Sequence, residues 1–285
     1  MAKFKTACVQ VNAGNDLTAN IALTSEMVRR AREAGAAFIT TPEAVVMIER
    51  GRRNIVAKAA PEAEHPGVAA FAELARETGA WLLGGSFAVT LEDEDRLANR
   101  SLLFDPQGRI VARYDKIHMF DIDLPGGESY RESRVYRPGD AAVLAELPWA
   151  VLGMTVCYDM RFPHLYRELA RAGAEVLTVP SAFTRPTGRA HWHVLLRARA
   201  IETGCYVVAP AQCGVHAGGR ETYGHSLIVS PWGEVIVDGD EEPGLVMAEL
   251  DTDAVAEARS RIPALQHDRP YSAPVPAGRL ADAAE

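Results

Sequence analysis

The sequence has little of what several classes of protein require. Its 285 residues include only four cysteines (Cys8, Cys157, Cys205 and Cys213), none in a C-x-x-C pair with zinc-ribbon spacing. This excludes a disulfide scaffold and favours a reducing compartment. The net charge of -8 and the lack of a Lys/Arg-rich block argue against a nucleic-acid partner, because a phosphate backbone selects basic surfaces. We therefore expect a small-molecule partner.

Long apolar runs and flexible linkers are also missing. No stretch of about 18 apolar residues is present to span a bilayer, and the N-terminal MAKFKTACVQVN lacks the apolar h-region of a signal peptide. We expect a cytoplasmic protein with no membrane partner. Because no linker rich in Gly, Ser or Pro divides the chain, we predict a single domain over residues 1–268 and an extended C-terminal tail over 269–285.

The order of predicted elements repeats once along the chain. GAAFITTPEA (35–44) aligns with GAEVLTVPSA (173–182), and LLFDPQGRIV (102–111) aligns with LIVSPWGEVI (227–236). Between the paired segments, each half carries one more amphipathic helix and one more apolar strand. This order predicts two similar α/β halves. Since each sheet would carry helices on one face only, packing of sheet against sheet gives a four-layer α-β-β-α sandwich.

Cys157 stands where a predicted strand gives way to a helix, expected to begin near Arg161. A strand-to-helix turn lifts a side chain out at a sheet edge and leaves backbone N–H groups unpaired, which suits a nucleophile beside an oxyanion donor. Taken alone, a buried packing cysteine is an equally good interpretation. A cysteine nucleophile needs a base, and the candidates are His164, His191, His193 and Glu43. For each histidine, packing or hydrogen bonding is the commoner interpretation.

Glu43 lies between the apolar stretches FIT and AVVMI. Desolvation disfavours an ionised carboxylate unless a cation compensates, and this is one way for a glutamate to become basic enough to take a thiol proton. Lys116, in the otherwise apolar segment RYDKIHMF, is the candidate cation, although surface lysines are the commoner case. In the internal repeat, Glu43 falls where Ser181 falls in the second half.

Three motifs taken together carry a resemblance to a known family. TTPE with Glu43, YDKIHMFD with Lys116 and GMTVCYDMRFP with Cys157 resemble, in order and spacing, the Glu-Lys-Cys triad of the nitrilase superfamily of carbon-nitrogen hydrolases. The similarity continues through PSAFTRPTGRAHWHVLLRARAIETGCYVVAPAQCG and YGHSLIVSPWGEVI, so it covers nearly the whole chain. The resemblance implies the α-β-β-α sandwich, a homodimer or higher homo-oligomer joined through the helices after the nucleophile, and no metal or organic cofactor.

The resemblance also implies a mechanism. Cys157 attacks a carbonyl carbon, and Glu43 serves as general base and then as acid to the departing amine. Lys116 stabilises the oxyanion together with the Tyr158 backbone N–H. A thioester forms, and water activated by Glu43 releases the acid. Glu132, in YRESR, matches a second glutamate of the family that helps to position substrate.

The metal alternative is disfavoured by spacing. His191 and His193 lie two residues apart on a predicted helix, so they point to different faces and do not readily share one ion. Cys205 and Cys213 are interpreted as core cysteines, and Asp159 and Arg161 as residues that brace a turn.

The predicted substrate is a small-molecule amide. The chain is most similar to amidases related to mammalian Nit proteins, and RAIETGCYVVAPAQCG favours the branch that hydrolyses deaminated glutathione to 2-oxoglutarate and cysteinylglycine. An anionic substrate needs cations, for which Arg161, Arg185 and Arg189 are candidates. The candidate substrate-binding residues are Phe183, Thr184, Arg185, His191 and Trp192, with core packing an equal alternative for Trp192.

Other interpretations stay open. An ω-amidase acting on 2-oxoglutaramate or 2-oxosuccinamate would use the same triad, as would another aliphatic amidase or carbamoylase of the superfamily. A catalytically silent binding module is the alternative from a different class, and the intact triad counts against it. A Cys/His hydrolase would instead depend on His164 or His191 and tolerate loss of the Glu43 carboxylate.

Overall fold

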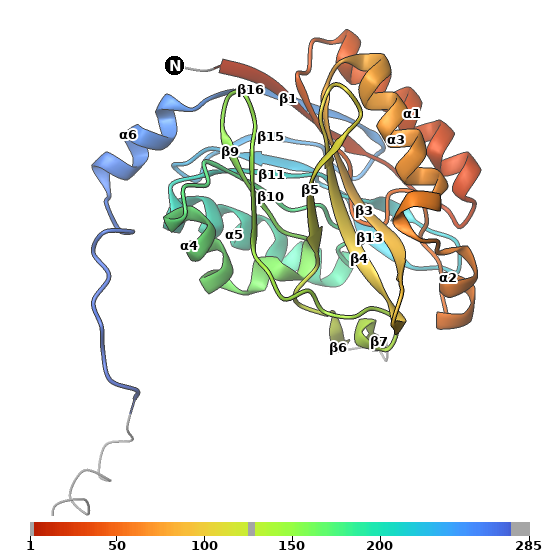
Figure 1. Ribbon diagram of the computed structural model, residues 1–285. Helices are drawn as coiled ribbons and strands as arrows, with labels where there is room; N and C mark the ends of the chain where they lie inside the picture. The colour runs from red at the N-terminus through yellow and green to blue at the C-terminus, as the bar shows by residue number, and fades with distance from the viewer. Residues whose placement is uncertain (1–2, 125–128, 275–285) are drawn as a thin grey trace, which may run out of the picture.

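Two six-stranded sheets form the centre of the computed structural model, which describes residues 3–124 and 129–274 (Figure 1). The strands of the first sheet are β1 (Lys3–Gln10), β2 (Phe38–Thr40), β3 (Trp81–Leu91), β4 (Glu94–Phe104), β5 (Ile110–Asp115) and β16 (Gly244–Asp251). Those of the second are β8 (Val143–Glu146), β9 (Val151–Met154), β10 (Val176–Thr178), β11 (Tyr206–Ala209), β14 (Leu227–Val229) and β15 (Val235–Asp238). Their spatial orders are β16-β1-β2-β3-β4-β5 and β15-β14-β11-β10-β9-β8.

Helices and short hairpins connect these strands. The helices are α1 (Leu17–Glu33), α2 (Arg52–Lys58), α3 (Pro66–Thr78), α4 (Pro163–Arg171), α5 (Arg185–Thr203) and α6 (Asp253–Arg261). Single turns of 3-10 helix span Glu62–Glu64, Glu132–Arg134 and Cys157–Arg161. Two small hairpins pair β6 (Asp121–Asp123) with β7 (Ser129–Arg131) and β12 (Cys213–Val215) with β13 (Glu221–Tyr223).

The predicted internal repeat is confirmed in the strand pairing. The order β1-β2-β3 is parallel and continues antiparallel through β4 and β5; β9-β10-β11 is likewise parallel and continues antiparallel through β14 and β15. Each sheet also has an antiparallel edge strand that the repeat did not predict. β8 precedes its neighbour β9, whereas β16 comes from the far end of the chain to lie beside β1.

The layers follow from the alternation of side chains along the strands. Cys8 and Phe38 point into the core that both sheets share, whereas Val9 and Ile39 belong to the core beneath the outer helices. In Figure 1, α1 and α3 cover the outer face of the first sheet, and α4 and α5 cover the second. This is the predicted α-β-β-α sandwich.

The local signals at the first helix also agree with the structure. The Asp16 carboxylate accepts a hydrogen bond from the Ala19 N–H at 3.1 Å, which caps α1. Gly35, two residues after the helix ends at Glu33, has φ +92° and turns the chain toward β2.

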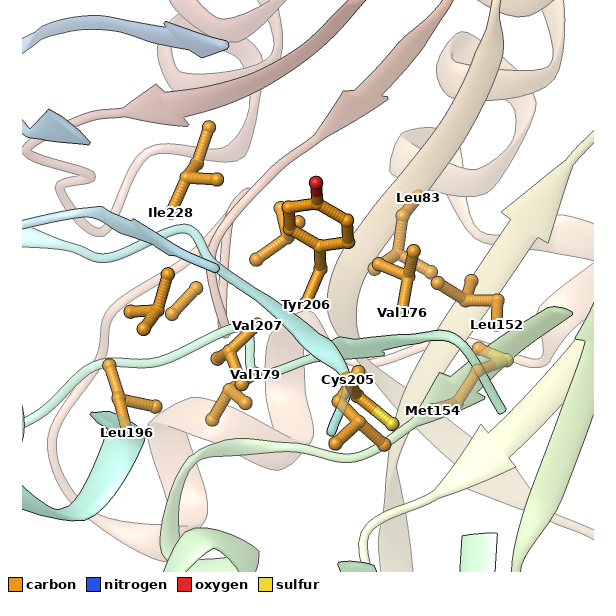
Figure 2. Close-up of a cluster of buried hydrophobic side chains, with 14 of the residues drawn as sticks. Leu83, Leu152, Met154, Val176, Val179, Leu196, Cys205, Tyr206, Val207 and Ile228 are labelled. Carbon is orange, nitrogen blue, oxygen red and sulfur yellow. The ribbon is translucent and has the colours of Figure 1, made fainter. Parts of the chain in front are cut away.

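Apolar side chains fill the space between the sheets. Leu83 of β3 lies in one cluster with Leu152 and Met154 of β9, Val176 of β10 and Ile228 of β14 (Figure 2). Fully burying one such side chain contributes roughly 1.5–3 kcal/mol. Because this core is continuous across both sheets, the ends of β2, β5 and β9 are held in a fixed relation.

The two halves of the chain also pair directly just beyond the ends of β1 and β11. Val11, just after β1, forms a parallel bridge with Gln212, and its carbonyl accepts the Cys213 N–H at 3.0 Å. The Gln212 side-chain amide donates to the carbonyl oxygens of Glu43 at 3.1 Å and Ala44 at 3.3 Å. The second half of the chain therefore fixes the loop that carries Glu43.

The C-terminal segment leaves the sandwich after α6. Residues 262–274 contain no helix or strand, and of the predicted tail only 269–274 lie within the described residues, where they are exposed; 275–285 lie outside them. Across the part of the chain that the structure describes, every helix is too short or too polar to cross a membrane.

Candidate active site

Cys157 begins the 3-10 turn that follows β9. Its backbone has φ +49°, a left-handed conformation that costs a non-glycine residue on the order of 1–3 kcal/mol, and its N–H donates to the Pro180 carbonyl at 2.9 Å. The regular helix starts at Pro163 rather than near Arg161, because the 3-10 turn intervenes. Cys157 is 6 % exposed and lines a cavity.

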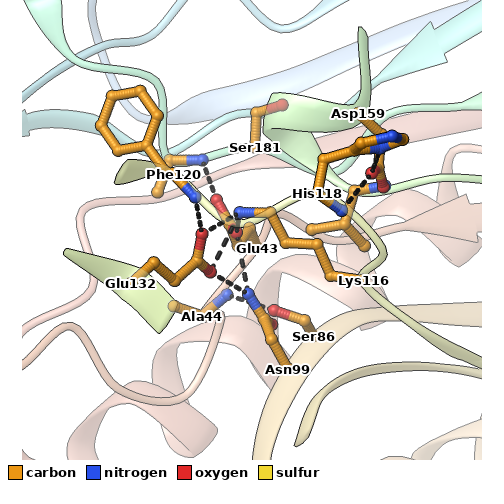
Figure 3. Close-up of polar contacts among 12 residues, drawn as sticks. Glu43, Ala44, Ser86, Asn99, Lys116, His118, Phe120, Glu132, Asp159 and Ser181 are labelled. Atoms are coloured by element: carbon orange, nitrogen blue, oxygen red, sulfur yellow. Dashed lines mark hydrogen bonds and ion pairs between the residues drawn. The ribbon is translucent and has the colours of Figure 1, made fainter. Parts of the chain in front are cut away.

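Asp159 holds this turn in place, as predicted. Its fully buried carboxylate accepts hydrogen bonds from the Val156 N–H at 2.8 Å and the Tyr114 hydroxyl at 2.7 Å. The His118 N–H donates to it at 3.0 Å, and the His118 ring nitrogen lies 2.7 Å away (Figure 3). The backbone just before Cys157 and two residues of the β5 region are thus tied to one carboxyl group.

Glu43 and Lys116 form a buried ion pair beside the thiol. Glu43 follows β2, Lys116 follows β5, and Lys116 Nζ lies 2.8 Å from Glu43 Oε1 (Figure 3). The second carboxylate oxygen of Glu43 accepts the Ala182 N–H at 3.0 Å. The Glu43 carboxylate is also within hydrogen-bonding reach of the Cys157 thiol. The structure therefore brings the three predicted catalytic residues together.

Glu132 completes the contacts of the lysine. Lys116 Nζ lies 2.8 Å and 3.0 Å from the two Glu132 oxygens, and the Phe120 N–H donates to Glu132 at 2.7 Å. Asn99 Nδ2 donates to both Glu43 and Glu132, at 3.0 Å each. Sequence reasoning missed Asn99, because Arg100 and Ser101 follow it in β4 and its polar side chain is not distinctive there.

The charges of this cluster follow from its contacts. Burial would raise the pKa of Glu43, but the Lys116 charge and hydrogen bond outweigh it and hold the pKa below its usual 4.5. Burial likewise opposes the charged form of Lys116, yet Glu132 and Glu43 raise its pKa well above 10.5. Desolvation was expected to make Glu43 more basic, and Lys116 reverses that direction.

The pKa of Cys157 shifts in the opposite direction to that of Glu43. Burial, followed by the negative charge of Glu43, raises the pKa of the thiol above its ordinary 9.0. At neutral pH the site therefore holds a protonated thiol next to an ionised carboxylate and an ammonium group. A proton leaves the sulfur only when something else stabilises the developing thiolate.

The cavity in front of these groups has a volume of about 620 Å³. Volumes of roughly 300–1,000 Å³ are typical of pockets for small molecules. Glu43, Lys116, Cys157 and Glu132 all line it, so the polar cluster faces a space large enough for a small molecule.

Comparison with known proteins decides the family. The sequence profile described as "Carbon-nitrogen hydrolase" matches residues 5–260. The chain belongs to the carbon-nitrogen hydrolase family. It is 42% identical to the deaminated glutathione amidase of Homo sapiens over 93% of this chain and 82% of that one, and 38% identical to the protein of that name from Yersinia enterocolitica over 99% and 98%. The C. elegans NitFhit structure superposes with a TM-score of 0.86 at 35% identity, covering 94% of this chain and 66% of that one.

The predicted substrate-binding residues of this hydrolase divide into two groups. Phe183 and Thr184 line the cavity. Among the described residues, Arg185, His191 and Trp192 are not part of its lining. These three residues lie on α5 and point in other directions. Residues that are close to Phe183 in sequence can still lie on different faces of the helix.

The contacts of those three residues show where they point. Arg185 lies 3.5 Å from the Glu221 carboxylate. His191 Nδ1 lies 3.3 Å from the Arg161 guanidinium. Trp192 is fully buried and donates its indole N–H to the His225 carbonyl at 2.7 Å, so core packing is the better interpretation.

Arg161 packs against Tyr158, the residue that follows the nucleophile. The Arg161 guanidinium lies over the rings of Tyr158 at 5.6 Å and Phe183 at 5.2 Å. Neither Arg161 nor Arg189 lines the cavity among the described residues. Arg220, which sequence reasoning missed, does line it, and its segment HAGGRETYG gave only the signal of a glycine turn.

Among the described residues, the lining of the cavity does not include His191, His193, Cys205 or Cys213. His191 and His193 point to different faces, as predicted, and His193 Nε2 contacts Asp238 at 2.9 Å. His193, His225 and Asp238 offer ligand atoms within 4.8 Å of one another, a cluster that was not anticipated. The four cysteines are buried and unpaired, which agrees with the interpretation of Cys205 and Cys213 as core residues.

Proposed function

We propose that this carbon-nitrogen hydrolase is an amidase that cleaves deaminated glutathione into 2-oxoglutarate and cysteinylglycine, with Glu43, Lys116 and Cys157 as its catalytic residues. The observation that carries the proposal is the convergence of these three side chains on one cavity. The substrate is supported by the names of the relatives that match nearly the whole chain.

The first step forms a covalent intermediate. The Cys157 sulfur bonds to the carbonyl carbon, and its proton passes to the Glu43 carboxylate. The raised pKa of the thiol and the lowered pKa of Glu43 oppose this transfer in the resting site. Proton transfer and C–S bond formation therefore occur together, since the forming bond consumes the sulfur lone pair that would otherwise hold the proton.

The oxyanion that develops on the carbonyl oxygen needs donors. Lys116 supplies an ammonium group, and the Tyr158 N–H supplies a second donor from the residue after the nucleophile. One such donor typically contributes about 2.7–4 kcal/mol to the transition state. Glu132 and Asn99 act as positioning residues, because their contacts fix Lys116 and Glu43 before substrate arrives.

Breakdown of the tetrahedral intermediate expels the amine. Protonated Glu43 gives its proton to the leaving nitrogen, which makes the amine a competent leaving group. A thioester joins the acyl group to Cys157. Water then loses a proton to Glu43 and attacks the thioester carbon, the carboxylic acid leaves, and the thiol recovers the proton from Glu43.

One side-by-side measurement tests the substrate. kcat/KM is determined for deaminated glutathione and for 2-oxoglutaramate, with Cys157→Ala protein as the blank. A preference of 100-fold or more, about 2.7 kcal/mol of differential transition-state stabilisation, is expected for deaminated glutathione. The same preference for 2-oxoglutaramate would instead make the protein an ω-amidase. Activity at the level of the blank on both compounds contradicts the proposed substrate.

Assembly and domain structure belong to the same proposal. We place residues 1–268 in one domain with 269–285 as a tail, and two copies join through α4 and α5. The shared core of the two sheets supports the first point, and the exposed apolar side chains Val194 (67 %) and Ile201 (55 %) on α5 support the second. Light scattering on the purified protein checks the dimer, and the double variant Val194→Asp with Ile201→Asp should be monomeric.

We also place the protein in the cytoplasm. Its cysteines are unpaired, which suits a reducing compartment.

A further inference from the structure

The cavity is lined by a partly buried arginine, Arg220, that the catalytic scheme does not use. In the part of the chain that the structure describes, Arg137, Arg185 and Arg220 each bury an Nε atom with no hydrogen-bond partner. Arg137 lies 3.7 Å from the Asp115 carboxylate, and Arg185 lies 3.5 Å from Glu221. Within the same described residues, Arg220 has no carboxylate partner; it contacts a carbonyl and a tyrosine ring.

Contacts of the β12–β13 hairpin with neighbouring segments position Arg220. It lies just before β13, whose Tyr223 N–H donates to the Phe183 carbonyl at 2.9 Å. Its Nη2 donates to the Ala182 carbonyl at 2.5 Å, and its guanidinium carbon lies 5.5 Å from the centre of the Tyr130 ring. The Nε atom keeps its donor capacity, and the whole group is preorganised to meet an anion.

Arg220 is also close to the catalytic cluster. The Ala182 residue that accepts from Arg220 donates its own N–H to Glu43 at 3.0 Å. The positive charge of Arg220 contributes to lowering the pKa of Glu43. Both side chains line the same cavity as Cys157. An anion bound to Arg220 thus belongs to a molecule that reaches the nucleophile.

The other cations around the cavity are less suited to bind an anionic substrate. Lys116 is shared by two carboxylates, and Lys58 is paired with Glu49 at 2.5 Å. Arg50 has no carboxylate partner in the described chain, but it is exposed to water, where a charge pair is weak.

We infer that Arg220 binds a carboxylate of the substrate and makes the enzyme selective for anionic amides. This rests on the proposed function, because deaminated glutathione carries one carboxylate at its 2-oxo acid end and another at its glycine end. A guanidinium group forms strong, directional hydrogen bonds with a carboxylate, and partial burial strengthens the pair. Selectivity also follows, since a neutral amide would leave the buried donor of Arg220 unpaired.

The test crosses enzyme variants with substrates that differ by one carboxylate. Arg220→Gln and Arg220→Lys are compared with wild type, and Lys58→Gln is the control that removes a charge from the same cavity wall. The substrates are deaminated glutathione, its 4-oxopentanoyl analogue with a methyl group in place of the 2-oxo acid carboxylate, and its C-terminal carboxamide. kcat and KM are measured separately, and circular dichroism checks that each variant is folded.

The inference expects a loss that depends on one carboxylate. Arg220→Gln should lower kcat/KM for deaminated glutathione by about 10- to 150-fold, the effect of a hydrogen-bonded charge pair. It should change the rate by less than about threefold on the analogue that lacks the recognised carboxylate, which also identifies the bound end. Arg220→Lys should retain part of the activity. An equal loss on all three substrates, or no loss, overturns the inference, as does an equal loss in Lys58→Gln.

A binding measurement separates this inference from the proposed function. If wild type does not cleave deaminated glutathione, the substrate proposal fails, and glutarate is titrated by calorimetry into Cys157→Ala protein with and without Arg220→Gln. Binding that is lost with Arg220→Gln supports the carboxylate site for another anionic amide. No binding, or binding that ignores the substitution, contradicts the role of Arg220.

Discussion

The two halves of the molecule share a scaffold but differ in the loops that extend from their strands. Glu43 after β2 and Ser181 after β10 occupy equivalent positions, three residues beyond each strand. Glu43 is ionised and bound to Lys116, whereas the buried Ser181 hydroxyl donates to the Val179 carbonyl at 2.9 Å. One half supplies the charged pair and the other supplies the thiol. The repeat therefore fixes where side chains are presented, and the loops decide their chemistry.

The largest loss of activity should come from removing Cys157, the thiol that the second half supplies. Cys157→Ala removes the nucleophile, so we expect kcat/KM to fall by at least about 10⁴-fold with the fold intact. Alanine also relieves little of the strain at φ +49°, so the melting temperature should change only slightly. A variant that keeps a substantial fraction of the wild-type rate would contradict the mechanism.

Equivalent substitutions in the two halves sharpen the comparison most directly. Glu43→Gln keeps the shape but loses the base, and should lower kcat by about 10²–10⁴-fold. Ser181→Ala, at the matching position, should leave kcat within about threefold of wild type, because it removes one neutral hydrogen bond. Single-turnover rates for both proteins provide the measurement. Similar losses in the two variants would mean that position, rather than charge, matters.

The lysine of the first half should affect both rate and stability. Lys116→Met removes an oxyanion donor, which should lower kcat by about 10²–10³-fold. It also leaves Glu43 and Glu132 buried without a cation, so the free energy of unfolding should fall by about 3–5 kcal/mol. Urea titration and kinetics at low temperature separate the two effects. If only KM changed, the proposal that Lys116 stabilises the oxyanion would be wrong.

The smallest effect concerns His216, which lies between β12 and β13 in the second half. Burial, and then the nearby Arg220 charge, lower the pKa of His216 from 6.5 to about 4, although its contact with the Ala13 carbonyl opposes this. The folded state thus favours neutral His216, whose stabilising contribution is full above pH 6.5 and declines as pH falls toward 4. The urea midpoint should fall across this window more in wild type than in His216→Gln. Parallel curves would contradict this role.

Much of the fold was predictable because apolar strands and helix caps are local signals. The pairs β2 with β10 and β5 with β15 carry the repeat in their own residues. The edge strand β16 was not predictable in this way, because its partner β1 lies more than 200 residues earlier in the chain. Pairing over such a distance leaves no trace in a short window of sequence.

The residues of the candidate site also divide into those with a local sequence signal and those without one. Glu43, Lys116 and Cys157 were predicted because their three motifs, taken together, resemble those of a known family. Asn99 and Arg220 were missed because their partners are remote and their own segments look like an ordinary strand and turn. Three residues of α5 were predicted to bind substrate, yet Arg185, His191 and Trp192 contact Glu221, Arg161 and the His225 carbonyl.

The pairing of β1 with β16 has a consequence for the order of events on the ribosome. All eight residues of β1 are matched to residues of β16, and 234 positions separate Gln10 from Gly244. At elongation rates of about 5–20 residues per second, β1 waits roughly 12–47 s for its neighbour. During that time one edge of the first sheet is open to pairing with other chains. Nascent chains stalled before residue 244 should therefore bind chaperones more strongly than chains stalled after β16 has emerged.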